Sequence, residues 1–154
     1  MINNDVLRSV RYMLNIDDAT LARIVGLGGQ EVSAAEISAY LKRDEEPGYT
    51  ECTNGVMAHF LHGLIIYRRG RDESDPPRPV DTHITNNSVL KRLRVAFELN
   101  EEGMLAIMRA AKFPVSRSEL SALFRNPAHV NFRACGDQFL RNFLKGLTAH
   151  LRPT

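Results

Sequence analysis

Basic residues recur at helical spacing in two stretches of the chain that lie 83 residues apart. Arg8 and Arg11 stand in the first stretch, and Lys91, Arg92 and Arg94 stand in the second. Residues three apart share one side of a helix, so each stretch presents at least two cations together. Such a surface can bind phosphates, whereas the simpler interpretation is a solvated surface or an internal ion pair. We therefore treat these five residues as candidate nucleic-acid contacts.

Four other residues are candidate contacts for a protein partner. Asn4 and Asn87 each follow a second asparagine, and one asparagine of each pair is expected to be the N-cap of a helix. Tyr49 and Phe132 lie in two loops of equal length. An aromatic side chain on a loop either anchors a partner or, more simply, holds the loop on its own core.

The remaining reactive side chains match no catalytic or metal-binding pattern. Cys52 and Cys135 belong to no Cys-x-x-Cys motif, and each precedes an apolar helix, so we expect two buried free thiols. His59 and His62 stand three apart without a third ligand. A Gly-rich phosphate loop, a His-Glu-x-x-His motif and a serine nucleophile elbow are all absent. We therefore expect no metal, no cofactor and no catalytic residue, and a binding protein is favoured over an enzyme.

The spacing of these candidates follows from an internal repeat. Residues 3–69 align with residues 86–152 at a shift of 83 without a gap, and 17 of the 67 aligned pairs are identical. Chance does not hold one register over that length. The sequence therefore predicts two related domains, 1–69 and 86–154, joined by a polar, proline-rich linker at 70–85.

Each domain is expected to contain four helices. The first begins at the Asn3-Asn4 or Asn86-Asn87 pair, and the second begins at acidic residues. The third has the clearest local signal, because a serine followed three residues later by a glutamate forms a capping box, and both copies have one. The two boxes are Ser33 with Glu36 and Ser116 with Glu119.

The fourth helix of each copy is the most apolar and contains a glycine, Gly63 or Gly146. Glycine inside a helix costs about 1 kcal/mol relative to alanine, so its presence in both copies indicates a close helix crossing. A four-helix unit of this size would be marginal alone. We therefore predict an all-α fold in which the two units pack about a pseudo-twofold axis, with the fourth helices central.

Charge is distributed unevenly along the chain. The net charge is +2, with 20 Lys and Arg against 18 Asp and Glu, but residues 86–154 carry 11 cations against 5 carboxylates. This asymmetry favours an anionic partner. The amino terminus has no basic region followed by an apolar one, and no apolar run is long enough to span a bilayer. We therefore expect a cytoplasmic protein.

The repeat, the segments GYTEC, NFRACGDQFL and FLHGLI, and the run Arg68-Arg69-Gly70 together resemble the bacterial YehS-like proteins. These are small cytoplasmic proteins built from a tandem domain of unknown function, and the resemblance covers essentially the whole chain. It implies an all-helical duplicated fold and supplies no activity. Our first hypothesis is a non-enzymatic binding or regulatory protein that presents a duplicated helical surface to a protein partner. The alternatives are a nucleic-acid-binding accessory protein and an enzyme with its site between the repeats.

Overall fold

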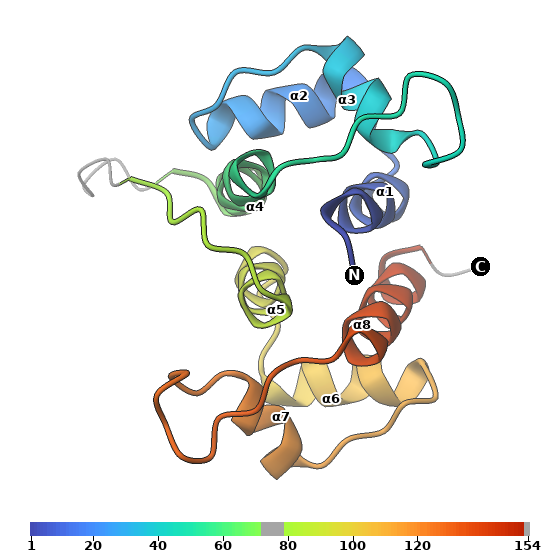
Figure 1. Ribbon diagram of the computed structural model, residues 1–154. Helices are drawn as coiled ribbons and strands as arrows, with labels where there is room; N and C mark the ends of the chain where they lie inside the picture. Colours follow the sequence, from blue (N-terminus) through green and yellow to red (C-terminus); the bar gives the residue numbers. More distant parts are fainter. Residues whose placement is uncertain (72–78, 153–154) are drawn as a thin grey trace.

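The computed structural model describes residues 1–71 and 79–152, and in this part of the chain every regular element is a helix (Figure 1). The first copy of the repeat contains α1 (Asn3–Leu14), α2 (Asp18–Leu27), α3 (Ala34–Leu41) and α4 (Asn54–Arg69). The second contains α5 (Asn86–Ala96), α6 (Glu101–Ala110), α7 (Arg117–Leu123) and α8 (Asp137–Leu151). The predicted all-α duplicated fold is confirmed. Part of the expected linker, residues 72–78, lies outside the described residues.

The starts of the third helices agree with the sequence. Ser33 accepts a hydrogen bond from the backbone N–H of Glu36, and the Glu36 carboxylate accepts one from the N–H of Ser33. Ser116 and Glu119 form the same reciprocal pair at α7. Both predicted capping boxes are confirmed, and each satisfies two backbone donors that a helix leaves unpaired at its start.

The starts of the first helices differ from the prediction. The N-cap of α1 is Ile2, which offers no side-chain hydrogen bond, and the N-cap of α5 is Thr85. Neither asparagine pair caps its helix. The prediction of an asparagine N-cap is therefore wrong, because the asparagine side chains are engaged in hydrogen bonds to distant parts of the chain.

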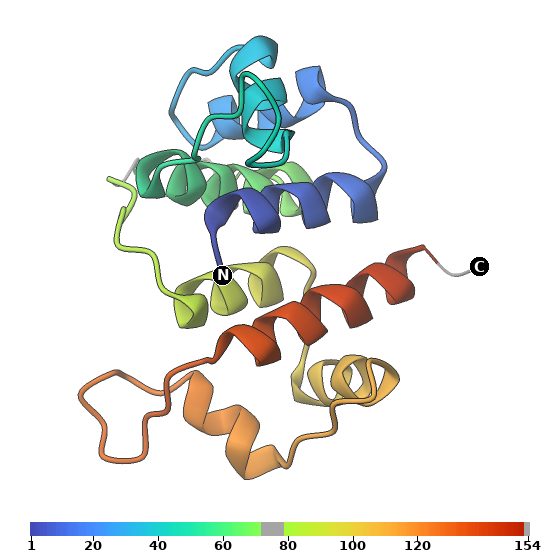
Figure 2. The same ribbon diagram turned by 45° about the vertical axis from the view of Figure 1, so that its right-hand side comes forward.

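The helices α1, α4, α5 and α8 form the centre of the molecule, and all four point in the same direction (Figure 2). At one end, the Asn3 side chain donates to Oδ1 of Asn54 at 2.9 Å, which joins the starts of α1 and α4. Asn86 donates to Oδ1 of Asp137 at 2.8 Å, which joins the starts of α5 and α8 in the same way. The positive ends of four helix dipoles therefore meet at this end of the bundle.

The opposite end of the bundle is closed by arginines that cross between the copies. Arg68 of α4 donates to the carbonyl of Ala96 at 3.2 Å, and its guanidinium lies 4.3 Å from the centre of the Phe97 ring. Arg152, just after α8, donates to the carbonyl of Tyr12 at 2.8 Å and lies 4.3 Å from that ring. Each arginine places a cation at the C-terminal end of a helix of the other copy, where the helix dipole favours positive charge.

The two copies meet through reciprocal helix pairs. Helix α1 packs on α8 and helix α4 packs on α5, so the first helix of each copy contacts the fourth helix of the other. This arrangement confirms the pseudo-twofold packing. It refines the expectation about the centre, because the fourth helices are central and each one contacts the other copy chiefly through that copy's first helix.

The outer helices α2 and α6 approach the central helices closely at Gly63 and Gly146, which occupy the same position in the two copies. A Cβ added to Gly63 on α4 would lie 1.8 Å from the carbonyl oxygen of Ile24 on α2. A Cβ added to Gly146 on α8 would lie 2.5 Å from the carbonyl oxygen of Ile107 on α6. The predicted close crossings are thus confirmed. None of the helices in the described ranges is both long and apolar enough to cross a membrane.

Candidate functional site

Asn4 and Asn87 fasten a long loop to the first helix of each copy. The Asn4 amide donates to the carbonyls of Tyr40 and Thr50, both at 2.9 Å, and accepts from the N–H of Cys52 at 2.9 Å. Asn87 makes the same three contacts, with the corresponding residues Leu123, Arg133 and Cys135. Asn4 is fully buried, so its side chain is part of the interior and is not displayed to a partner.

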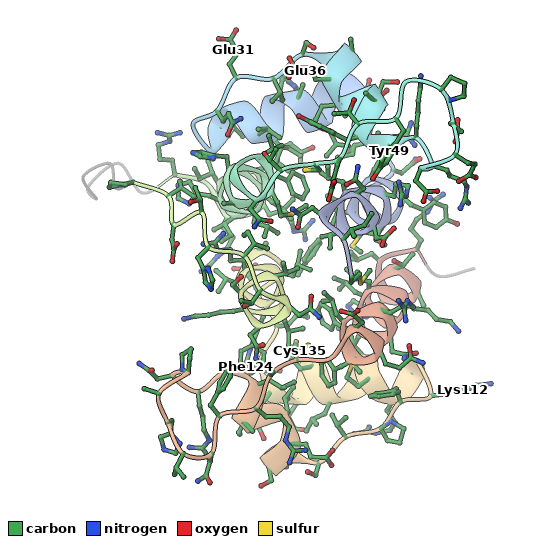
Figure 3. All side chains as sticks on the ribbon, in the orientation of Figure 1. Glu31, Glu36, Tyr49, Lys112, Phe124 and Cys135 are labelled. Carbon is green, nitrogen blue, oxygen red and sulfur yellow. The ribbon has the colours of Figure 1, made fainter. Side chains whose placement is uncertain are left out.

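The aromatic candidates lie on the loops that these asparagines hold. Tyr49 and Phe132 are both half-buried, and the backbone N–H of each closes a turn, onto the carbonyl of Glu46 or His129. Figure 3 shows Tyr49 on the loop after α3, close to α1. Their half-buried rings leave part of each surface open, and the two loops lie on opposite sides of the bundle (Figure 1). The structure therefore does not bring Tyr49 and Phe132 together.

In the first copy, both basic candidates are neutralised by nearby carboxylates. Arg8 forms an ion pair with Asp5 one helical turn away and also donates to the carbonyl of Lys42 at 2.9 Å. Arg11 donates from Nε to Oδ1 of Asp18 at 3.2 Å. The first copy thus has the simpler arrangement anticipated from the sequence, in which the arginines are used internally.

In the second copy, the matching carboxylates are missing or engaged elsewhere. The position equivalent to Asp5 is Ser88, whose hydroxyl is used in the cap of α5. The position equivalent to Asp18 is Glu101, whose carboxylate accepts from Nη1 of Arg117 at 2.9 Å. Arg117 also pairs with Glu102. Between them, these changes leave Lys91 and Arg94 without the carboxylates that neutralise Arg8 and Arg11.

Lys91 and Arg94 line an open groove of about 500 Å³, which we call the basic groove. Arg69, at the end of α4, also lines it and pairs with Glu98 at 3.4 Å. The Arg94 guanidinium lies 4.6 Å from the centre of the Phe124 ring, and its Nε donates to the carbonyl of Leu99 at 3.0 Å. The groove is lined by Arg69, Lys91, Arg94, Val95, Glu98, Leu99, Asn100 and Phe124.

The charge of the basic groove is positive, because it holds three cations and one carboxylate among the described residues. Lys91 is exposed and forms no salt bridge within residues 1–71 and 79–152. Three of the other lining residues, Val95, Leu99 and Phe124, are apolar, and we call these three the floor of the groove. Figure 3 shows Phe124 just after α7, between that helix and α5. Such a groove can hold an anionic group and an apolar group side by side.

Arg92 does not contribute to the basic groove. It lies on another side of α5, where its Nη2 donates to the carbonyl of Asp81 at 3.0 Å, and it lines a small hollow of about 150 Å³ together with His62. Partial desolvation lowers the pKa of His62, whose side chain is largely exposed, and the neighbouring arginines Arg92 and Arg71 lower it further. The structure therefore separates Arg92 from Lys91 and Arg94, with which the sequence had grouped it.

A second cavity, of about 510 Å³, lies between the two copies at the end where the central helices begin. It is lined in part by equivalent pairs, Asn3 with Asn86 and Val6 with Val89, so the pseudo-twofold axis passes through it. Of its described lining residues, Glu51 is the one with a carboxylate and Cys52 the one with a thiol.

The two cysteines are buried free thiols, as expected from the sequence. Burial raises the pKa of Cys52 to about 12 and that of Cys135 to about 11. A protonated thiol is a poor nucleophile, so neither residue is activated for chemistry. His59 bonds through Nδ1 to the carbonyl of Gly55 at 2.7 Å, whereas His62 is exposed. Throughout the described chain, no three His, Cys, Asp or Glu side chains gather closely enough to hold a metal ion.

Of the residues that line the basic groove, the sequence singled out Lys91 and Arg94 as candidates but not Arg69 and Phe124. Arg69 reaches the groove from the other copy of the repeat, because α4 packs on α5. Phe124 follows α7 and is brought to α5 by the fold of its own copy. Helical spacing groups residues within one helix, so contributions from other helices remained hidden. The one available signal was the recurrence of Arg69 as Arg152.

The fold and the groove define a class of protein: a small helical bundle made of two copies of one unit, with a positive groove on the second copy. The chain belongs to the family described as "Protein of unknown function (DUF1456)", whose model matches residues 3–70 and 86–152. It is 48% identical over 149 residues to the "Uncharacterized protein YehS" of Escherichia coli (strain K12), covering 97% of this chain and 96% of that protein. No solved structure matches the chain.

Proposed function

We propose that the protein is a cytoplasmic, non-enzymatic binding protein that captures an acidic segment of a protein partner in the basic groove. The observation that supports this proposal is that equivalent cations of the two copies differ in their ion pairs. Arg8 and Arg11 are neutralised within the first copy, whereas the carboxylates that would neutralise Lys91 and Arg94 are replaced or diverted. Unpaired cations beside an apolar floor favour binding of an anion from outside the chain.

A protein segment fits the groove better than a nucleic acid does. Nucleic acids are bound along an extended run of cations that neutralises successive phosphates. The basic groove is compact, Glu98 lies at its edge, and the first copy carries 7 cations against 9 carboxylates. A long polyanion would therefore meet repulsion beyond the groove. The unpaired thiols of Cys52 and Cys135 fit a reducing compartment, which supports the cytoplasm as the location.

Nucleic-acid binding is the second candidate, and one observation favours it. Residues 86–154 carry 11 cations against 5 carboxylates, which is the asymmetry of many accessory proteins that bind phosphate backbones. This candidate predicts that cations outside the basic groove matter as much as those within it. Arg92, which lies on another side of α5, provides the comparison.

The test is fluorescence anisotropy of three labelled probes, a glutamate-rich peptide, duplex DNA and single-stranded RNA, titrated with the whole chain at several salt concentrations. The proposal expects the peptide to bind, and expects Lys91→Ala with Arg94→Ala to weaken its binding by about tenfold or more. Arg8→Ala with Arg11→Ala is the matched control, because it removes the equivalent cations of the first copy. Equal losses from both pairs, or no peptide binding at low salt, would refute the proposal.

The nucleic-acid probes decide the second candidate in the same experiment. Binding of DNA or RNA with a steep salt dependence, weakened by Arg92→Ala as strongly as by Arg94→Ala, would favour nucleic acid over a protein segment. The peptide proposal expects Arg92→Ala to leave peptide affinity within about twofold, because this side chain faces Asp81. Circular dichroism of each variant checks that its helices remain folded.

A further inference from the structure

We infer that the basic groove recognises an acidic segment that carries an apolar side chain next to its carboxylates, and that this side chain enters the floor of the groove. The inference rests on the proposed function and names the kind of segment that the groove selects. Its basis is the arrangement of charge and apolar surface inside one cavity of about 500 Å³. A surface that bound acidic groups through charge alone would not require apolar residues inside the groove.

The cations and the apolar residues of the floor line the same groove. Arg69 comes from α4, whereas Lys91 and Arg94 come from successive turns of α5. Val95 and Leu99 line the same groove and are only half-buried, so part of their apolar surface is open. A carboxylate bound at the edge therefore brings the neighbouring side chain over the floor.

The Phe124 ring fixes the position of the cation that would bind this carboxylate. The Arg94 guanidinium lies 4.6 Å from the ring centre, and its Nε is held by the carbonyl of Leu99. An arginine held in this way loses less side-chain freedom when it binds an anion, so the site is prepared before the ligand arrives. The first copy has Leu41 at the position of Phe124, so Arg11 has no such ring beside it.

The first copy lacks the other parts of the site as well. Its equivalents of Val95 and Lys91 are Tyr12, which lies under Arg152, and Arg8, which pairs with Asp5. Tyr12 is 59% exposed, but its ring already carries the guanidinium of Arg152, whereas the equivalent residue of the second copy is the aliphatic Val95. The inference therefore assigns apolar-plus-acidic recognition to the second copy alone, and one segment is expected to bind per chain.

The experiment compares two labelled peptides that differ at one position. Glutamates flank a central leucine in the first peptide and a central serine in the second, and anisotropy measures the affinity of the whole chain for each. The leucine peptide is expected to bind about tenfold more tightly, because burying a leucine side chain contributes at least that factor. Val95→Thr places a hydroxyl on the floor at nearly the same volume, and is expected to reduce the preference to about twofold.

Each outcome supports or overturns a separate claim. A leucine preference that falls from about tenfold to about twofold in Val95→Thr supports the inference. Equal affinities for the two peptides would overturn it and leave the proposed function standing, because acidic segments would still bind. A leucine preference that survives in Val95→Thr also overturns it, since the leucine would then bind elsewhere. If neither peptide binds, the proposed function fails together with the inference.

Discussion

The side-chain oxygen of Asn4 accepts a hydrogen bond from the backbone N–H of Cys52, 48 residues further along the chain, at 2.9 Å. Asn4→Ala would leave this N–H and two carbonyls without partners in a buried position, so we expect a loss of about 3 kcal/mol in the free energy of unfolding. Asn87→Ala should cost about half as much, because Asn87 is only half-buried and water can replace some of its contacts. Urea unfolding followed by circular dichroism measures both.

Asn131→Ala is the control for these two variants. Asn131 lies on an exposed loop, and its change should shift the free energy of unfolding by no more than about 0.5 kcal/mol. The order Asn4, then Asn87, then Asn131 is the expected ranking of the losses. Similar losses at all three positions would mean that the asparagines do not fasten the loops.

Gly63 permits the close approach of α4 to α2, and a Cβ there would lie 1.8 Å from the carbonyl oxygen of Ile24. Gly63→Ala should therefore destabilise the protein by about 3 kcal/mol, although alanine is the better helix former. Gly146→Ala should cost less, because its Cβ would lie 2.5 Å from the oxygen of Ile107. Thermal and urea unfolding of each variant give the comparison.

Gly26→Ala is the matched control, because Gly26 lies in a helix with no atom near the position of an added Cβ. This change should stabilise the protein by about 0.5–1 kcal/mol, since it raises helix propensity and restricts the unfolded chain. The opposite signs at Gly26 and Gly63 are the expected result. A stabilising Gly63→Ala would be incompatible with the observed crossing.

The buried thiols make stability depend on pH in the alkaline range. Burial raises the pKa of Cys52 to about 12 and that of Cys135 to about 11, whereas a thiol in an unfolded chain has a pKa of about 8.5. The folded state therefore retains protons that the unfolded chain releases. The resulting contribution to stability is complete below about pH 8.5 and is lost as the pH rises toward the folded values.

Urea unfolding at about pH 8 and about pH 10 tests this dependence. The free energy of unfolding should fall between the two, and the fall should be smaller for Cys52→Ala with Cys135→Ala, which has no thiol to ionise. The difference between the two slopes isolates the thiols from lysines and tyrosines that titrate in the same range. Parallel slopes would show that the thiols are not protected by the fold.

Local sequence signals predicted those parts of the fold that depend on neighbours in the chain. The capping boxes at Ser33 and Ser116 each depend on residues three apart, and the sequence located both. The role of Asn4 could not be read in this way, because its partners lie 36 to 48 residues away. An asparagine before an apolar helix has the same local appearance whether it caps that helix or fastens a loop.

The candidate site likewise has features that depend on neighbours in the chain and features that depend on distant residues. The spacing of Lys91 and Arg94 predicted that they share one side of a helix, and both line the basic groove. Whether a cation is free depends on carboxylates that folding brings near it, and Arg11 is paired with Asp18 only through the turn after α1. Aligning the copies shows that Glu101 is the counterpart of Asp18, but only the structure shows that Glu101 pairs with Arg117 and not with Arg94.

Restoring the first copy's ion pairs in the second copy tests the proposed site without changing any residue that lines the groove. Ser88→Asp supplies the counterpart of Asp5 beside Lys91, and Arg117→Ala frees Glu101 to pair with Arg94 as Asp18 pairs with Arg11. The combined variant should bind the glutamate-rich peptide about tenfold more weakly, with a shallower salt dependence, because its cations are already neutralised. Anisotropy titrations at two salt concentrations measure both effects.

The converse variant makes the test symmetrical. Asp5→Ser with Asp18→Ala removes the carboxylates that neutralise Arg8 and Arg11, so the first copy should gain an affinity for the peptide that it lacks in the native chain. A second, weaker binding event per chain is the expected result, since the first copy has Leu41 where the second has Phe124. If the first variant keeps full affinity and the converse variant gains none, then the diverted carboxylates do not determine where an acidic segment binds.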